Sequence, residues 1–217
     1  MEAVTGLSRR TLIFLGLALI LGVVASAVAT VVSSSPQPGC PDAEYGCATF
    51  EAGEPVILGV LSDRDDVAAQ VREAVEQQGG RLAGRPVRIL AWNDRCRVAS
   101  AAAGARELAT DSPDEPPVVG VVAETCPRAL TPAAQILSDS GVTVISPVPI
   151  GLPSSAGRAS FYLVPGADPR ADVTEAAAGA ILAVAESLAR PGPDGALLVP
   201  RTPLRDGLVD AGFVPGA

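Results

Sequence analysis

"PVILGVLSDRDDVAAQVREAVEQQGG", residues 55–80, contains the pattern that decides the fold. Its first eight residues are a short apolar and β-branched run, which is typical of a buried strand. Val67, Val71 and Val75 then recur at helical spacing, and a glycine pair closes the segment as at a helix end. The stretch therefore predicts a strand followed by a helix.

The alternation of strand and helix repeats along the chain. Further strands are predicted at 85–94, 116–124 and 142–147, and the segments 97–111 and 128–141 have the alanine content and apolar spacing of helices. Consecutive strand–helix units fold as a parallel sheet with right-handed crossovers and with helices on both faces. We therefore expect an α/β, Rossmann-like lobe.

The composition agrees with such a core and argues against several functions. Hydrophobic residues make up 48% of the chain and aromatic residues only 3%, so the core is built from small aliphatic side chains. The net charge of −8 and the lack of a basic stripe argue against a nucleic-acid partner. No phosphate loop or dinucleotide fingerprint is present, and the chain has no histidine. We expect no cofactor, no metal and no enzymatic activity.

An apolar run from Thr11 to Val32 follows Ser8-Arg9-Arg10. About 20 such residues can cross a bilayer as a helix, and the positive charges before them orient the rest of the chain outside the cytoplasm. The same residues can be read as a cleaved signal, because Arg9-Arg10 resembles a twin-arginine signal and 27–29 read Ala-Val-Ala. We expect residues 1–10 in the cytoplasm and the main domain on the extracytoplasmic side of the cell membrane, or secreted if the signal is cleaved.

The four cysteines, at positions 40, 47, 96 and 126, are expected to form disulfides because the domain is exported. Four cysteines allow three pairings. Zinc is disfavoured, since the chain has no histidine and no C-x-x-C spacing. Cys96 and Cys126 follow the second and third predicted strands, which suits a disulfide if these strands are close. The alternative is a redox-active pair, which the arginines at 95, 97 and 128 would favour.

Ligands of parallel sheets bind beyond the carboxyl ends of the strands, where loops and helix starts meet. Ser62 and Ser146 lie at two such ends, where a serine hydroxyl either donates to a ligand or closes the following turn. Trp92 is expected to pack in the core or at a lobe interface, and could also stack on a solute. The acidic run 63–66 either binds a cation or favours the start of the following helix.

Five segments carry a resemblance to a known family: "GEPVILGVLS", "QGGRLAGRPVRILAWNDRC", "VVGVVAETC", "AAQILSDSGVTVISP" and "RDGLVDAGF". In order and spacing they resemble the branched-chain amino-acid (leucine/isoleucine/valine) substrate-binding proteins of ABC transporters, over roughly residues 40–213. The resemblance implies the type I periplasmic binding fold, a two-lobed clamp that closes on a solute. It also implies a disulfide between Cys96 and Cys126.

The resemblance places the ligand-binding residues at strand ends: Ser62, Thr125, Pro127, Arg128, Ser146 and Ile150. The family usually carries hydroxyl groups after the second cysteine and after the fourth strand. This chain has Pro127, which supplies no N–H, and Ile150, which has no hydroxyl. Arg128 could replace the neutral donors by pairing with a carboxylate, or could be a solvated surface residue.

These features predict a linker with a Cys40/Cys47 loop at 33–54, a ligand-binding lobe at 55–165, and a crossover helix with the start of a truncated second lobe at 166–217. The expected function is binding of an amino acid or similar carboxylate by a membrane-tethered domain that works with an ABC permease. The alternative is a non-catalytic structural or protein-interaction module that has lost its solute. Self-association would then restore a cleft between two lobes.

Overall fold

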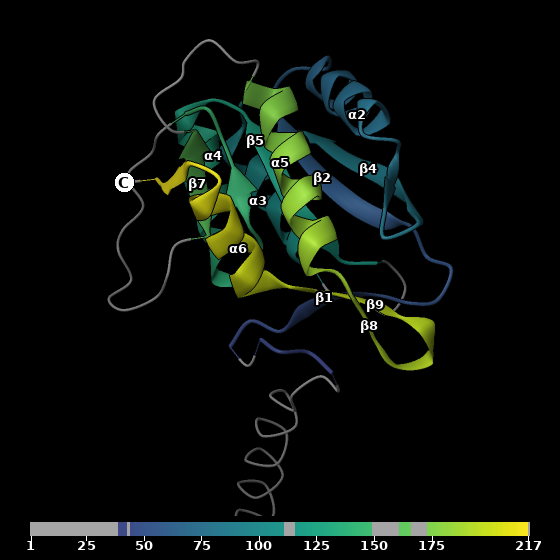
Figure 1. The fold of residues 1–217 in the computed structure, drawn as a ribbon. Coiled ribbons are helices and arrows are strands. Elements are labelled where there is room, and N and C mark those ends of the chain that lie inside the picture. The colour runs from purple at the N-terminus through teal and green to yellow at the C-terminus, as the bar shows by residue number, and fades with distance from the viewer. Residues whose placement is uncertain (1–38, 43, 111–115, 149–160, 166–172, 217) are drawn as a thin grey trace, which may run out of the picture. The chain divides into compact units, whose positions relative to one another are not determined.

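Five parallel strands, β4, β2, β5, β6 and β7, form the centre of the fold, and a short antiparallel strand lies at each edge of their sheet (Figure 1). In spatial order the strands are β10 (Phe213–Pro215), β7 (Tyr162–Pro165), β6 (Val144–Ile145), β5 (Val118–Glu124), β2 (Val56–Ser62), β4 (Arg85–Asn93) and β3 (Arg81–Leu82). This computed structural model describes residues 39–42, 44–110, 116–148, 161–165 and 173–216. The order β4-β2-β5-β6-β7 is that of a doubly wound α/β sheet, in which ligands bind beside the first strand at its carboxyl end.

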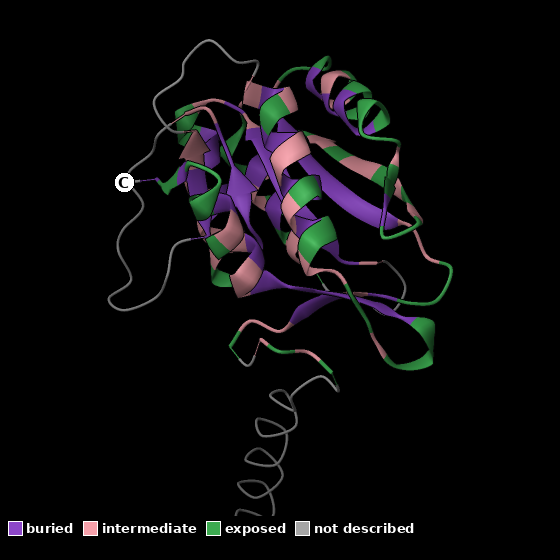
Figure 2. Ribbon diagram, in the orientation of Figure 1, coloured by how far each residue is buried: buried purple, intermediate pink, exposed green. Residues whose placement is uncertain are grey.

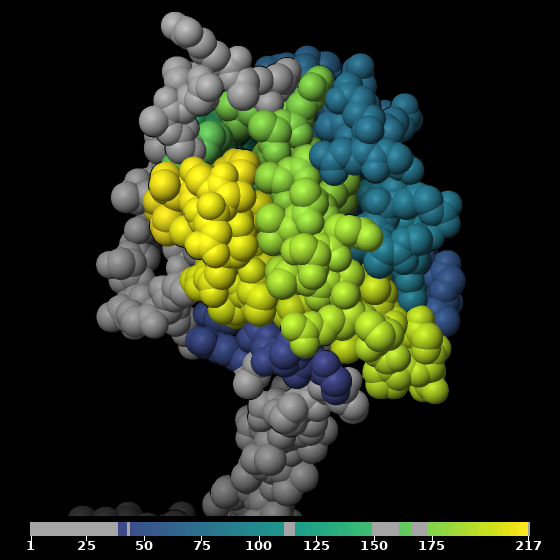
Figure 3. Space-filling view, in the orientation of Figure 1, coloured from purple at the N-terminus to yellow at the C-terminus, as the bar shows by residue number. Residues whose placement is uncertain are grey.

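Helices cover both faces of the sheet, as the repeated strand–helix pattern predicts. One face carries α2 (Val67–Gln77), α5 (Val173–Leu188) and α6 (Arg201–Asp210), and the other carries α3 (Val98–Ala109) and α4 (Pro127–Asp139). Figure 3 shows α6, α5 and α2 side by side over the first face. The α/β class is therefore confirmed, and the predicted strands at 55–62, 85–94, 116–124 and 142–147 correspond to β2, β4, β5 and β6.

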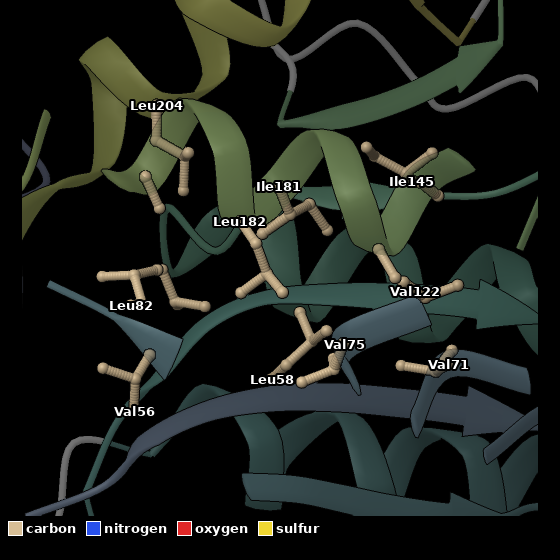
Figure 4. Packing of buried hydrophobic residues seen from close by; sticks show 14 of the residues in the cluster. Val56, Leu58, Val71, Val75, Leu82, Val122, Ile145, Ile181, Leu182 and Leu204 are labelled. Atoms are coloured by element: carbon tan, nitrogen blue, oxygen red, sulfur yellow. The ribbon is translucent and has the colours of Figure 1, made fainter. Parts of the chain in front are cut away.

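Strand β2 is buried along its whole length, because it has a neighbouring strand on each side and helices on both faces (Figure 2). Leu58 and Val60 point into the layer under α2 and α5, whereas Ile57 and Leu61 point into the layer under α3 and α4. Figure 4 shows the first layer, where Ile181 of α5 lies among apolar side chains of the sheet and α2. Burial of each large aliphatic side chain stabilises the fold by about 1.5–3 kcal/mol.

A second, three-stranded sheet joins the two ends of the described chain. β1 (Cys47–Phe50) pairs antiparallel with β9 (Leu197–Pro200), which pairs with β8 (Arg190–Pro191) on its other edge; the turn between β8 and β9 contains the 3₁₀-helix η1 (Pro193–Gly195). Arg85 ties this sheet to β4, since its guanidinium donates to Phe50 O at 3.0 Å and to Gly195 O at 2.6 Å. Periodicity did not predict the β1–β9 pairing.

The C-terminal elements pack on the same unit, Pro38–Ala217, as the central sheet. The segment "GALLVPRTPLRDGLVDAGF" contains β9, α6 and the start of β10, and β10 pairs with β7 at the edge of the central sheet. The assignment of 166–217 to the start of a second lobe stays a prediction. None of the helices in the described residues combines the length and apolar character required to span a bilayer. The predicted anchor at 11–32 lies outside these residues.

Candidate functional site

Both predicted disulfide-forming pairs are present in the structure. Cys40 pairs with Cys47 at a Cα–Cα distance of 5.9 Å, and Cys96 pairs with Cys126 at 5.5 Å. The strands that precede Cys96 and Cys126 are not neighbours, however, because β2 lies between β4 and β5. The disulfide therefore does not join neighbouring strands. The two loops instead bend toward each other across the carboxyl end of β2, and the disulfide spans that end.

A buried carboxyl lies beside this disulfide. Asp94 is completely buried, and its Oδ1 accepts the Thr125 hydroxyl at 2.9 Å and the Cys96 backbone N–H at 2.6 Å. Burial raises the pKa of Asp94, against the lowering effect of these two hydrogen bonds, and the charge of Asp63 raises it further. The predicted ligand residue Thr125 is thus buried and engaged with Asp94.

Ser62 and Ser146 close turns at their strand ends. Ser62 Oγ accepts the backbone N–H of Arg64 at 3.0 Å, and Ser146 Oγ accepts that of Val148 at 3.2 Å. Both serines are buried. The turn interpretation of these residues is therefore confirmed. Each serine oxygen acts as an acceptor in its turn, so the turn does not use the hydroxyl hydrogen.

A hollow of about 240 Å³ lies at the carboxyl ends of the central strands. It is lined by Arg64 from the loop after β2, Gln70 of α2, Glu124 at the end of β5, Pro147 after β6, and Val173 and Thr174 at the start of α5. Strand ends, loops and a helix start converge here, as expected for the ligand site of a doubly wound sheet. The predicted location of the site therefore contains a real concavity.

Charged side chains of the protein cross this hollow. Arg64 Nη1 lies 2.6 Å from Glu124 Oε1, and the other carboxylate oxygen of Glu124 accepts the Thr174 hydroxyl at 2.6 Å. The remaining guanidinium nitrogens bind Asp66 with two hydrogen bonds, at 2.9 and 2.6 Å. The Arg64 hydrogen bond lowers the pKa of Asp66, and the same contact together with the charge of Glu124 raises the pKa of Arg64.

A smaller hollow of about 140 Å³ is also lined by Arg64, and Ser62, Asp65 and Asn93 are among its other lining residues. Asn93 donates to the Asp65 carboxylate within it. Arg64 lines both hollows and is about half exposed, at 49%. It is therefore the one guanidinium common to the two concavities.

The remaining predicted ligand residues lie elsewhere at the rim. Pro127 and Arg128 are exposed in the first turn of α4, and with Thr125 and Ser146 they line neither of these two hollows. Ile150 lies outside the described residues. The predicted role of these side chains in ligand binding stays a prediction.

Sequence reasoning did not single out Arg64 or Glu124 as ligand-binding residues. Glu124 carried a signal, because it ends the third predicted strand and so had to reach the ligand edge of the sheet. Arg64 was not considered as a ligand-binding residue because it stands among the three aspartates of the run 63–66. One interpretation of that run was that its acidic residues favour the start of the following helix. Asp66 is the N-cap of α2, but its carboxylate binds Arg64 and makes no hydrogen bond to the helix backbone.

Two other predicted features have a structural explanation. Trp92 packs on Gly104 of α3, its Nε1 donates to Ser100 Oγ at 3.3 Å, and it also lines the smaller hollow, so packing is confirmed and stacking on a solute stays a prediction. The Asp63 carboxylate lies within 4.8 Å of the Cys96 and Cys126 sulfurs. Those sulfurs are bonded to each other, so this group offers a metal only a single carboxylate.

The lobe is thus a doubly wound α/β unit with a charged hollow at the ligand edge of its sheet. No protein-family model matches the chain, and no curated protein matches it either. Among solved structures it is similar to an ABC transporter substrate-binding protein from Desulfitobacterium hafniense in complex with Leu, at 24% identity and a TM-score of 0.38, covering 44% of this chain and 29% of that one. The strand order and register, rather than such scores, define the fold.

Two further similar structures belong to the same class. A leucine binding protein from Thermotoga maritima matches at 19% identity, with a TM-score of 0.40, over 50% of this chain and 32% of its own. An ABC transporter substrate-binding protein from Sphaerobacter thermophilus matches at 20% identity, with a TM-score of 0.42, over 52% and 32%. The chain thus spans about a third or less of the length of each. They are the class of protein that the sequence motifs resemble.

Proposed function

We propose that this chain is a membrane-tethered, extracytoplasmic solute-binding domain, and that its ligand is an amino acid or a similar small carboxylate. The observation that carries the proposal is the hollow of about 240 Å³ at the carboxyl ends of β2, β5 and β6, with Arg64 and Glu124 on its wall. A ligand carboxylate would pair with the Arg64 guanidinium, whose planar donors suit two-point recognition. A ligand ammonium would meet Glu124.

Binding in this way requires the ligand to compete with an internal ion pair. Glu124 holds Arg64 at 2.6 Å, so a ligand carboxylate that pairs with the guanidinium competes with the Glu124 carboxylate. A ligand with both a carboxylate and an ammonium satisfies both partners of the opened pair, whereas a simple carboxylate leaves Glu124 without its cation. This favours a zwitterionic ligand over a simple carboxylate.

The same ion pair favours a second candidate function. Glu124 supplies the carboxylate that a solute would otherwise bring, and its bond to Thr174 fixes the start of α5 against β5. A domain whose own side chains fill its ligand site suits a structural or protein-interaction role. For the solute-binding function the proposed partner is an ABC permease. For the structural or interaction function it is a second copy of the chain.

A ligand screen on the full chain, purified in mild detergent, separates these functions. Amino acids and small carboxylates are tested by thermal shift, and a ligand present at a hundred times its Kd should stabilise the folded state by about 2.7 kcal/mol. Arg64→Gln should abolish the shift, whereas the matched variant Arg128→Gln should keep it, because Arg128 lies on α4 outside the hollow.

The outcomes point in different directions. A shift that survives Arg64→Gln and disappears in Arg128→Gln would move the site to the start of α4. A folded chain that responds to no ligand would support the interaction module. Equilibrium sedimentation would then show whether the chain self-associates.

A further inference from the structure

The Cys96–Cys126 disulfide closes the ligand edge of the sheet, and its two sulfurs have different surroundings. Cys126 is the N-cap of α4, a helix of 13 residues, and the backbone N–H groups of Ala129 and Leu130 point back to its carbonyl at 3.0 Å. The amino end of a helix carries partial positive charge, which stabilises a thiolate and lowers the pKa of a cysteine placed there. Cys126 is therefore the better leaving group of the pair.

Cys96 lies in a loop under strain. Arg95 and Cys96 have φ values of 51° and 57°, a left-handed conformation that is unfavourable for two consecutive residues other than glycine. Side-chain oxygens of Asn93 and Asp94 accept the two backbone N–H groups and help to hold this conformation.

Asp94 connects the two loops independently of the disulfide. Its Oδ1 accepts hydrogen bonds from Cys96 N–H and from the Thr125 hydroxyl, one from each loop that the disulfide joins. The side chain is completely buried, yet its Oδ2 has no hydrogen-bond partner within the described residues. A buried acceptor without a donor is costly, so Asp94 is held in place at a cost to stability.

The surrounding charges oppose one another. The Asp63 carboxylate lies within 4.8 Å of both sulfurs and disfavours a thiolate at either. Three exposed arginines lie near the two cysteines in sequence, and their positive charges favour a thiolate: Arg95, Arg97 and Arg128. Cys96 also precedes a helix, since Arg97 is the N-cap of α3, but it stands one residue further from the helix than Cys126, which is itself the N-cap of α4. The position of Cys126 at the helix end itself is therefore what distinguishes the two sulfurs.

We propose that Cys96–Cys126 is a redox-active disulfide that exchanges with an extracytoplasmic dithiol donor. A thiolate of the donor attacks Cys96 Sγ, the Cys96–Cys126 bond breaks, and its electron pair leaves on Cys126 as a thiolate. The second donor sulfur, after losing its proton, then attacks the donor sulfur bound to Cys96. Cys96 leaves as a thiolate, and both cysteines take protons from solvent. The donor is oxidised to a disulfide, and its two electrons reduce the cysteine pair.

In this proposal Asp94 is a positioning residue. Its bonds to Cys96 and Thr125 keep the two loops together while the covalent tie is open, so that the disulfide can form again. This thiol–disulfide exchange takes place at the edge of the sheet and does not require a solute to bind, so it is independent of the proposed solute-binding function.

The chain contains its own comparison, because Cys40–Cys47 is a second disulfide with Cys47 buried in a strand that pairs with β9. The oxidised full chain is treated with dithiothreitol for increasing times, free thiols are trapped, and peptide mass spectrometry assigns them to each pair. We expect Cys96–Cys126 to open about tenfold faster or more, since a thiol of lowered pKa leaves faster. Circular dichroism should show a folded chain throughout, and removal of the reductant should restore the bond.

Equal rates for the two disulfides, faster opening of Cys40–Cys47, or opening only together with unfolding would each overturn the proposal. Two variants test the surroundings. Asp63→Asn removes a negative charge near both sulfurs and should accelerate attack by dithiothreitol several-fold. Asp94→Asn should slow re-formation of the bond and change its pH profile, whereas a role in folding alone would leave that profile unaltered.

Discussion

Asp42 Oδ2 accepts the backbone N–H of Thr202 at 2.7 Å, across 160 residues of sequence. Thr202 is the second residue of α6, and the N-cap of that helix is Pro200, which has no side-chain acceptor. Asp42 therefore supplies a helix cap from the Cys40–Cys47 loop. Tyr45 of the same loop packs edge-to-face on Phe161 at 4.6 Å, which adds an apolar contact beside the cap. The short disulfide loop is thus part of the folded unit.

Replacing Asp42 should destabilise the fold. Asp42→Ala removes an acceptor from the first turn of α6 and from the backbone of Tyr45, and loss of a helix cap costs about 1–2 kcal/mol. Urea unfolding of the full chain measures the change. Glu44→Ala is the matched control, because the Glu44 side chain is exposed and its substitution should stay within about 0.5 kcal/mol. Similar losses in both variants would contradict the capping role.

Asp42 also predicts a loss of stability in acid. Burial raises the pKa of Asp42, but hydrogen bonds from Thr202, Tyr45 and Glu44 outweigh it and hold the pKa below 3.8. The folded state then binds fewer protons than the unfolded state in this range, so stability is present above pH 3.8 and is lost as the pH falls through the folded pKa. In Asp42→Ala this part of the acid dependence should disappear. Unfolding curves at a series of acidic pH values would show it.

Asp94 predicts a pH dependence of opposite sign. Burial raises its pKa above 3.8, so the folded state binds more protons than the unfolded state between 3.8 and the folded pKa. Stability should fall as the pH rises through that window, and Asp94→Asn should lack this slope. The full chain and the variant are compared by urea unfolding on both sides of pH 3.8. An unchanged slope in Asp94→Asn would show that the carboxyl titrates as in the unfolded chain.

Local patterns predicted the elements of the fold, because each rests on neighbouring residues. The apolar run of β2 and the spacing of Val67, Val71 and Val75 were enough to assign a strand and a helix. The pairing of β1 with β9 could not be found in this way, since the two strands are about 150 residues apart and carry no complementary signal. Strand order is also absent from periodicity, so nothing in the local patterns placed β2 between β4 and β5.

The same limit applies to the candidate site. The sequence located the ligand edge of the sheet, and residues such as Glu124 follow directly from the end of a predicted strand. Which side chains meet there depends on strand order, on loop conformation and on the start of α5, where Thr174 contacts Glu124. Arg128 follows the cysteine in sequence, but the helix directs it to the surface, while Arg64 lies in the hollow.

If the proposed function holds, Glu124→Gln should change ligand preference. The variant removes the carboxylate that competes for Arg64, so a simple carboxylate should bind about tenfold more tightly, equivalent to about 1.4 kcal/mol. An amino acid should gain less, because its ammonium loses Glu124. Isothermal titration with a matched pair of ligands, one with and one without the amino group, measures the difference. Asp66→Asn is the control, since Asp66 holds Arg64 but does not line the hollow. A parallel change for both ligands would contradict the assignment of Glu124 to the ammonium.

Two helical glycines should respond in opposite directions to substitution by alanine. At Gly104 of α3 a Cβ would lie 2.5 Å from Trp92 Cγ, in the packed layer between helix and sheet, so the indole or the helix has to move. Overpacking of this kind costs about 1–3 kcal/mol, more than the roughly 1 kcal/mol that alanine gains over glycine in a helix. We expect Gly104→Ala to destabilise the chain.

At Gly179 of α5 the nearest atom to a Cβ is Gln78 Nε2, the end of a flexible side chain that can move aside. Gly179→Ala should therefore stabilise the fold, by up to about 1 kcal/mol. The two variants change the same atoms in helices on opposite faces of the sheet, so each controls for the other in urea unfolding. Stabilisation by both substitutions would show that Trp92 is free to move and that its packing on α3 is loose.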